Sequence, residues 1–266
     1  KQIVPILADE GTFIASESTF YRILREEKQL VHREPTRPAT KRHRPDEHVA
    51  TGPGQVWSWD ITYLRSPVRG MFFYYYAVID VWSRKLVGWT VEVEESAELA
   101  RIMIAEACKR EGVRRDELVI HSDNGAPMKA ATLLAFLQGL GIVQSFSRPS
   151  VSNDNPYSEA LFRTTKYRSH YPRGAFDSLD AARRWVNRFG RWYNTEHRHS
   201  AIKFVTPEQR HSGADVAILA RRARLYEAAK AKNPTRWTGS TRDWSRVESV
   251  TLNPSPESER DAVGAT

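Results

Sequence analysis

The sequence predicts an α/β fold, a mixed five-stranded sheet with helices on its faces. Residues 55–66 and 70–95 alternate and are rich in aromatic and β-branched side chains, as in three strands of a meander. A helical pattern and a short apolar run then alternate twice between 96 and 147, the order in which helices and strands build such a sheet. The 266 residues, 40% of them apolar, suffice for one large domain with smaller attachments.

Two helices are predicted ahead of this domain, within residues 1–32. The stretch IVPILADEG is helical in character and ends at Gly11, and Ser16 suits the N-cap of a second helix. Apolar residues recur at helical spacing on the second helix: Phe20, Ile23 and Leu24. The pair resembles either the second half of a helix-turn-helix or a plain helical hairpin. In the first case the residues that would face DNA are Ser18, Thr19 and Arg22.

Residues 33–54 predict a basic, proline-rich linker. They contain four prolines and no periodicity, and five basic residues stand against one acidic residue between Arg33 and Arg44. An extended segment of this kind can lie along the phosphates of a nucleic acid.

The middle of the chain supplies the elements of the sheet in order. Residues 55–66 predict one strand, and residues 70–95 predict two more that are joined at DVWSRK. We interpret Asp80, the first residue of that stretch, as a hairpin-turn residue. Residues 96–112 predict a helix that Gly112 ends, with an apolar face of Leu99, Ile102, Met103, Ala107 and Cys108. The run ELVIHSD predicts a short strand buried on both faces. A helix at 128–141 and a last strand at 142–147 follow.

Two more helices and an extension complete the chain. Residues 154–167 predict a helix with Asn155 at its N-cap and Pro156 at its first position. Residues 178–198 predict another, whose Trp185 and Trp192 we expect in the core. The extension at 213–266 is expected to be helical at first. Its RWTGSTRDW stretch leaves open a small β unit or a DNA-contacting extension.

Charge and composition narrow the class of protein. The net charge is +8 and the pI about 9.6, and nine basic residues stand against three acidic ones between Arg163 and Arg198. Clustered positive charge with interleaved aromatic residues indicates a polyanionic partner, most simply nucleic acid. The longest apolar run, 71–79, is far shorter than the roughly 20 residues of a membrane helix. The single Cys108 excludes an internal disulfide and a multi-cysteine zinc site.

These features predict a cytoplasmic protein with no membrane partner. No secretory signal opens the chain, and its first residue is Lys1, so we expect a fragment of a longer protein.

Three carboxylates stand out by their positions. Asp60 lies within the first strand, Asp123 directly follows the buried strand, and Glu159 lies in the first turn of the 154–167 helix. The two strands can lie side by side and parallel, which would bring both aspartates together near strand carboxyl ends. Crowded carboxylates repel, and a pair of Mg²⁺ ions about 3.5–4 Å apart would relieve that repulsion and clamp a phosphodiester. Each acid alone also fits a turn or an ion pair.

Residues near these acids suggest how the site would hold DNA. Lys166 is seven residues past Glu159 and so shares its helix face, where it could hold a phosphate. Asn124 and Gly125 form a turn that leaves Asp123 at the tip of its strand, with backbone N–H groups facing phosphate. His121 is expected to be a packed strand residue and no metal ligand.

Several motifs resemble those of insertion-sequence transposases of the type related to retroviral integrases. They are WSWDITYL, AVIDVWSRKLVGW, HSDNG, SFSRPSVSNDNPYSEALFRTTKY, WYNTEHRHSAI and TPEQR, with 35 residues between Asp123 and Glu159. The resemblance implies a ribonuclease-H-like catalytic core over 55–212, in which Asp60, Asp123 and Glu159 form a DDE triad that binds two Mg²⁺ or Mn²⁺ ions. The family normally has a longer N-terminal helical region for end recognition, of which only the tail is present.

The resemblance also implies a reaction and its partners. Such enzymes cleave the ends of a mobile element, release a 3′-hydroxyl and join it to target DNA. The partners implied are double-stranded DNA, as terminal inverted repeats and target, and further copies of the chain, in a nucleoid-associated complex. The DNA-contacting residues we expect in the core are Lys166, Asn124, Arg163, Arg148 and Arg168. Two alternatives are a ribonuclease-H-like nuclease without strand transfer and a non-catalytic, transposase-derived DNA-binding protein, against which the intact triad speaks.

Overall fold

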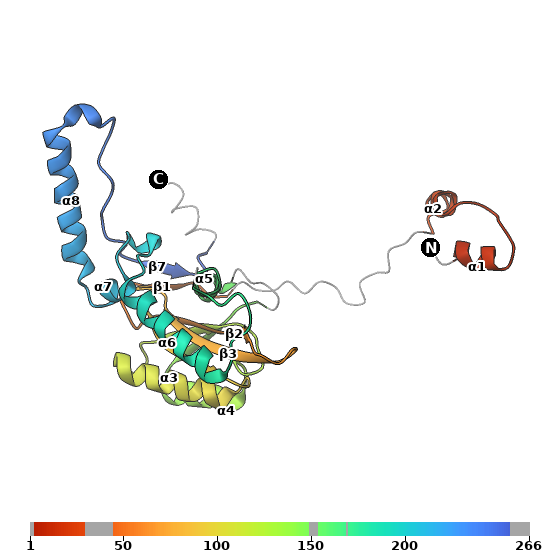
Figure 1. Ribbon diagram of the computed structural model, residues 1–266, viewed down its shortest axis with the longest axis horizontal. Helices are drawn as coiled ribbons and strands as arrows, with labels where there is room; N and C mark the ends of the chain where they lie inside the picture. Colours follow the sequence, from red (N-terminus) through yellow and green to blue (C-terminus); the bar gives the residue numbers. More distant parts are fainter. Residues whose placement is uncertain (1–2, 30–44, 149–153, 169, 256–266) are drawn as a thin grey trace. The chain divides into compact units, whose positions relative to one another are not determined.

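The computed structural model describes residues 3–29, 45–148, 154–168 and 170–255. The chain divides into two compact units, Lys1–Arg42 and His43–Thr266. The predicted sheet lies in the larger unit (Figure 1).

The sheet has five strands in the order β4-β3-β2-β5-β6. The first three strands along the chain pair antiparallel as a meander, and β5 and β6 run parallel to β2. This is the mixed sheet of the ribonuclease-H-like fold, and the predicted fold class is confirmed. The strands are β2 (Val56–Arg65), β3 (Phe72–Asp80), β4 (Leu86–Glu92), β5 (Val119–Ser122) and β6 (Val143–Phe146).

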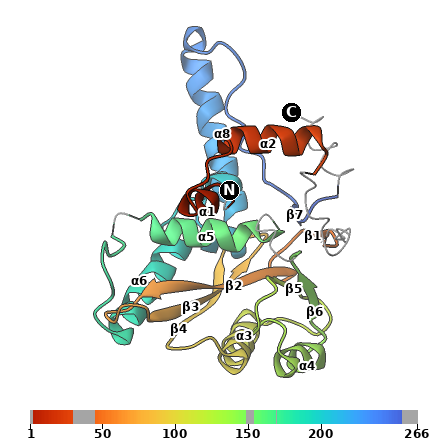
Figure 2. The same cartoon turned by 90° about the vertical axis from the view of Figure 1, so that its right-hand side faces the viewer.

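Helices cover both faces of the sheet, and the alternation of β2 explains which face each side chain meets (Figure 2). Trp57 and Trp59 are buried in the core under α3 (Ala97–Glu111) and α4 (Ala131–Gly139). Ser58 and Thr62 face the other side, where they contact α5. Because side chains alternate along a strand, Asp60 is directed to that side as well. The helices on that side are α5 (Pro156–Lys166) and α6 (Leu179–Thr195).

The helix α3 has the predicted ends, and of the predicted apolar face Met103, Ala107 and Cys108 are buried and Leu99 packs against the core. Ser96 caps it by accepting the backbone N–H of Glu98, and Gly112 ends it at φ 64°. Ile102, predicted on the apolar face, is 42% exposed, so that assignment was wrong. The side chains that are buried follow the i, i+3, i+4, i+7 spacing and leave Ile102 toward solvent: Ala100, Met103, Ile104 and Ala107, with Cys108 beside them.

The start of α5 is tied to β2 by the residue predicted as its N-cap. Asn155 occupies that position and Pro156 follows at N1, but the Asn155 side chain makes no capping hydrogen bond. Its carbonyl oxygen instead accepts from Ser58 Oγ at 2.5 Å, and its amide nitrogen donates to the Trp59 carbonyl at 3.3 Å. This contact fixes the first turn of α5 over the middle of β2.

The predicted linker is partly ordered as a strand. Its basic portion, 33–44, lies outside the described residues, but His48–Ala50 form β1, which pairs antiparallel with β7 (Val250–Leu252). Buried Ala50 and Leu252 pack in one cluster with Trp82, which explains why so short a pair forms. No local pattern in the sequence indicates this partner strand 200 residues away.

The C-terminal extension is helical and then returns to the core. It follows a 3₁₀ turn at Ser200–Ile202 and α7 (Pro207–His211), and it comprises α8 (Asp215–Lys232) and a 3₁₀ turn at Pro234–Arg236. The RWTGSTRDW stretch, for which a small β unit was one of two possibilities, forms no strand, and the β pairing of the extension lies further along the chain, at β7. Trp244 instead packs beside Tyr226 of α8 and closes a small cluster with Ile202, Val205 and Leu219.

The smaller unit contains the two predicted helices, α1 (Ile3–Asp9) and α2 (Glu17–Glu26). No residue of α2 is buried, and the predicted stripe residue Ile23 is 47% exposed. Ser18 and Arg22 are exposed, and the Thr19 hydroxyl lies 3.2 Å from that of Ser16. Their contact with DNA stays a prediction. No helix in the described part of the chain is long and apolar enough to cross a membrane.

Candidate active site

Asp60 and Asp123 occupy neighbouring positions on two parallel strands. The last pair of the β2–β5 ladder is Trp59 with Ser122, so each aspartate stands one residue beyond it. Asp60 lies in mid-strand, opposite Ala77 of β3, whereas Asp123 follows the end of β5. The structure therefore brings these two predicted residues together, through the parallel pairing expected from the sequence.

Glu159 completes the group from the first turn of α5. Buried hydroxyls of Ser58 and Ser158 lie 2.6 Å apart, which holds this turn on β2 next to Asp60. Burial raises the pKa of Glu159, and the negative charge of Asp123 raises it further.

Among the three acids, Asp60 has the most strongly raised pKa. Burial raises its pKa to about 7, and the charges of Asp123 and Glu159 act in the same direction. The opposing contribution is a hydrogen bond from the backbone N–H of Ile61, 2.7 Å from Asp60 Oδ1. A half-buried carboxyl with two acidic neighbours and so little compensation is the environment that a bound cation stabilises.

Asp123 is oriented by a neighbour that the sequence reasoning missed. Ser147 Oγ donates to Asp123 Oδ1 at 2.7 Å, and it lies 3.2 Å from Nε2 of the fully buried His121. The other ring nitrogen, Nδ1, lies 2.9 Å from Ser145 Oγ. Ser145 in β6 and Ser147 just after it are two residues apart, which puts both side chains on the same face, and this spacing was the available sequence signal.

His121 is the packed strand residue that the sequence predicted. Burial lowers its pKa to about 4, which keeps the imidazole neutral, although it lies close to Asp123 and Asp154. It therefore supports the wall of the site as a hydrogen-bonding side chain and supplies no positive charge.

Lys166 adjoins the carboxylates from the far end of α5. Its Nζ donates to Thr62 Oγ1 at 2.7 Å, two residues along β2 from Asp60. Burial lowers the pKa of Lys166, and the attraction of Asp60 opposes that shift. An ammonium group thus lies beside the acidic group, as its shared helix face with Glu159 predicts.

The other predicted DNA contacts are distributed around the site. Arg148 makes a two-pronged ion pair with Asp154, with both N···O distances 2.9 Å, and the Asn124 amide donates to the Ser147 carbonyl. Arg168 lies 3.5 Å over the ring of Trp192. Arg163 is exposed on α5. Trp185 is buried against Phe189, so the prediction that this tryptophan packs in the core is confirmed.

The donor set suits a hard divalent cation that also binds substrate. Within the described ranges, no three His, Cys, Asp or Glu side chains lie close enough together to hold a metal ion by themselves. Mg²⁺ seldom needs such a cage, since it is usually held by one or two carboxylates together with water and substrate phosphates. The under-compensated Asp60, with Asp123 beside it on the neighbouring strand, fits that role.

The comparison with protein families decides what kind of domain this is. Residues 50–152 match the family described as "Integrase core domain", and residues 140–207 match a second model of the same description. The chain belongs to the integrase core family. The matched region contains β2 to α6 and all three carboxylates.

Relatives of this integrase core are transposases of bacterial insertion sequences. The transposase for insertion sequence element IS904 from Lactococcus lactis is 29% identical over 160 residues, 60% of this chain and 62% of the relative. Transposase InsF for insertion sequence IS3A from Escherichia coli is 32% identical over 164 residues, 61% of this chain and 56% of the relative. The chain thus spans about 60% of the length of these relatives.

A solved structure with a similar fold is the HTLV-2 integrase catalytic core domain in complex with magnesium, in its trimeric form. It is 16% identical, with a TM-score of 0.46, and the match covers 60% of this chain and 97% of that chain.

Proposed function

We propose that this chain is a transposase that cleaves the DNA ends of a mobile element and joins the freed 3′-hydroxyl to target DNA. The observation that carries the proposal is the parallel pairing of β2 and β5, which sets Asp60 beside Asp123 under the first turn of α5. The family and its transposase relatives favour this activity over other chemistry on the same fold.

The reaction proceeds by two phosphodiester exchanges. Water attacks the phosphorus at the end of the element, and the 3′-oxygen leaves with a proton as a free hydroxyl. That hydroxyl then attacks a target phosphodiester, forms a new P–O bond and displaces the target's own 3′-oxygen. Each step exchanges one P–O bond for another, so no nucleotide cofactor is needed.

The side chains of the site would each have a distinct part in these steps. Asp60, Asp123 and Glu159 would hold two Mg²⁺ or Mn²⁺ ions, which when bound align the attacking and leaving oxygens. Ser147 holds the Asp123 carboxylate at a fixed angle, and Thr62 holds the Lys166 ammonium. Lys166 would bind a phosphate oxygen of the strand being cut.

The partners proposed are double-stranded DNA and other copies of this chain. Two element ends must be joined in one event, which requires at least two active sites on the DNA. Basic side chains on α5 and α6 would bind phosphates without reading sequence, so affinity should fall steeply with salt concentration.

The test is an assay of cleavage and strand transfer on labelled DNA that carries the sequences flanking the gene. Cleavage and joining are expected with Mg²⁺ or Mn²⁺, and EDTA is expected to stop both. Activity that persists in chelator would overturn the role of the metals. Cutting without joining would identify a nuclease, and binding without cutting would identify a non-catalytic DNA-binding protein.

A further inference from the structure

A basic, aromatic cleft lies beside the carboxylates, and apart from Lys166 its lining residues have no part in the chemistry described so far. Its volume is about 670 Å³, within the range of ligand-binding pockets. The β2–β3 tip, the end of α5 and the chain that leads on to α6 form its walls, and these segments lie together in Figure 2. The lining residues used below are Tyr63, Arg65, Phe72, Lys166, Tyr167 and Arg173.

The charge of this cleft is one-sided. Arg65, Lys166 and Arg173 line it, together with Arg168, and no lining residue is acidic. Arg65 and Arg173 form no ion pair with other residues in the described part of the chain. Unpaired guanidinium groups that face one cavity favour an anion with several oxygens, for which phosphates are well suited.

The aromatic side chains of the cleft are exposed to an unusual degree. Tyr167 is 84% exposed, Tyr63 52% and Phe72 42%. The ring of Tyr63 packs at 5.6 Å against Phe72 and at 5.4 Å against Tyr74, on the sheet face of Trp57 and Trp59, which leaves Tyr167 as the ring without an aromatic partner among those described. Large aromatic side chains left in water beside cations are typical of surfaces on which nucleic-acid bases stack.

The cleft is joined directly to the carboxylates. Lys166 lines it and also bonds Thr62, which lies between Asp60 and Tyr63 on the same strand. Arg65 is five residues past Asp60, about 17 Å along β2. A DNA strand whose scissile phosphate lies at Asp60 could therefore place a nucleotide near the cut inside this cleft.

We propose that the cleft binds an unpaired nucleotide of the DNA strand next to the cut site. Its base stacks on Tyr167, and its phosphates bind Arg65 and Arg173. Bases inside a duplex are covered on both faces by their neighbours, so this ring selects DNA that is frayed or single-stranded. This inference rests on the proposed function and assigns part of its substrate.

The experiment measures binding of the full chain to two DNA probes in EDTA, so that no strand is cut. One probe is a 20-base-pair duplex with a four-nucleotide single-stranded extension that carries 2-aminopurine, prepared with either polarity. The other is a fully paired duplex of the same length. We expect the extended probe to bind about tenfold tighter and its fluorescence to be quenched, because each stacked base adds affinity without regard to sequence.

Variants separate stacking from charge. Tyr167→Ala is expected to remove the preference for the extended probe and its quenching, and Tyr167→Trp to keep both. Leu225→Ala, at a residue that is 65% exposed on α8, is the matched control and should behave as the parent. Arg65→Ala and Arg173→Ala should weaken binding to both probes, whereas Arg114→Ala, whose side chain is 82% exposed elsewhere, should not.

Equal binding of the two probes by the parent would overturn the inference. So would a loss in Tyr167→Ala that is the same for paired and extended DNA, since the cleft would then contact only the backbone. Neither result depends on catalysis. Failure of the parent to cut and join would instead overturn the proposed function.

Discussion

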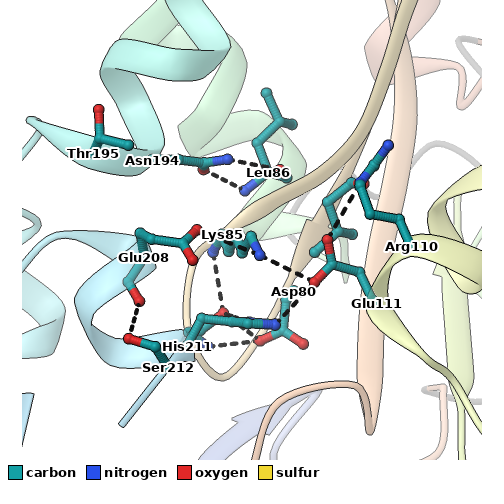
Figure 3. A network of polar contacts seen from close by, with 12 residues as sticks. Asp80, Lys85, Leu86, Arg110, Glu111, Asn194, Thr195, Glu208, His211 and Ser212 are labelled. Atoms are coloured by element: carbon teal, nitrogen blue, oxygen red, sulfur yellow. Dashed lines mark hydrogen bonds and ion pairs between the residues drawn. The ribbon is translucent and has the colours of Figure 1, made fainter. Parts of the chain in front are cut away.

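Buried carboxylates occur in two regions of this molecule, and the fold treats them differently. At the end of the sheet where β3 gives way to β4, Asp80 and Glu111 are surrounded by donors (Figure 3). At the edge formed by β2, β5 and α5, Asp60 has acidic neighbours and one hydrogen bond from the adjacent backbone N–H. The same chemical group thus lies in a satisfied environment and in an unsatisfied one within one domain.

The satisfied region, around Asp80 and Glu111, is a hydrogen-bonded network that joins β3, α3 and α7. Asp80 accepts from the backbone N–H groups of Gly54 at 2.8 Å and Ser83 at 2.7 Å, and from the Ser83 hydroxyl at 2.7 Å. Glu111, at the end of α3, accepts from Lys85 Nζ at 3.0 Å and lies 3.1 Å from His211 Nε2 of α7. Asp80 is accordingly a structural turn residue, as the sequence analysis interpreted it.

A second satisfied carboxylate attaches the C-terminal extension. Asp215 is fully buried and accepts from Arg246 at 2.7 and 2.9 Å, with Arg210 3.6 Å away. Both guanidinium groups also lie over the ring of Trp82, at 4.0 and 4.8 Å. The extension is therefore held to the core by paired charges as well as by the short β1–β7 sheet.

The difference between the regions indicates which carboxylates are structural. A buried carboxylate is stable only when the protein pairs it or when a ligand completes it. Removing the charge of a carboxylate should therefore lower the free energy of unfolding where the carboxylate is paired, and leave it unchanged or raise it at the edge formed by β2, β5 and α5.

The largest effect is expected at the unsatisfied edge, on activity. Asp123→Asn should reduce cleavage and joining by about a thousandfold or more, equivalent to about 4 kcal/mol of transition-state stabilisation. It should leave the melting temperature unchanged or raise it, because the charge of Asp123 raises the pKa of both Asp60 and Glu159. Kinetic assays and thermal unfolding measure the two effects.

The matched control for that variant is Glu106→Gln, which removes an exposed charge from α3 on the other face of the sheet. It should change neither quantity. A fall in the stability of Asp123→Asn large enough to account for its loss of cleavage and joining would show that Asp123 has a structural role.

The next largest effect is expected at Asp215, on stability. Asp215→Asn leaves the buried Arg210 without its carboxylate and should lower the free energy of unfolding by about 3 kcal/mol. Denaturant titration measures it, with Asp243→Asn as the control, because Asp243 pairs with Lys203 at the surface and should matter little. Equal effects of the two variants would contradict the comparison.

Glu111 adds a pH dependence to the satisfied region. Burial acts to raise its pKa, but hydrogen bonds from His211 and Lys85 outweigh it and lower the pKa to about 2. A lowered pKa stabilises the fold above the unfolded value of about 4.3, and this contribution is lost as the pH falls through 2. The stability difference between the parent and Glu111→Gln, about 2 kcal/mol at pH 6, should therefore shrink between pH 5 and pH 2 in urea titrations. A pH-independent difference would exclude this role for the carboxylate.

Local patterns in the sequence predicted the elements well and their distant partners poorly. Periodicity located the strands and helices, and the parallel pairing of two short strands placed Asp60 beside Asp123. The apolar spacing along α3 did not predict that Ile102 is exposed, because the elements that pack against a helix in the folded protein decide which of its faces is buried. Likewise β1 depends on Val250–Leu252, and neither strand is long enough to be recognised by itself.

The same limit explains what was missed at the site. Asp60, Asp123 and Glu159 could be proposed from the sequence because Asp60 is an acid inside an apolar strand, Asp123 directly follows a strand and Glu159 lies in the first turn of a helix. Ser147 was missed, because its spacing from Ser145 is only a weak signal and its contact with Asp123 depends on how β5 and β6 pair and on where the chain leaves β6.

Ser147 provides the smallest predicted effect and the closest test of the comparison. Ser147→Ala removes the hydroxyl that orients Asp123 but leaves all three carboxylates in place. Loss of a hydrogen bond to a metal-binding carboxylate typically costs about tenfold in activity or metal affinity, so we expect a tenfold fall in cleavage and a higher Mg²⁺ requirement. Ser147→Thr retains a hydroxyl and should recover part of both, and titration of activity with Mg²⁺ measures the change. A purely structural role would lower the melting temperature without moving the Mg²⁺ midpoint. A shifted midpoint at unchanged stability would place Ser147 with the under-compensated group, as the residue through which the fold holds Asp123 ready for a cation.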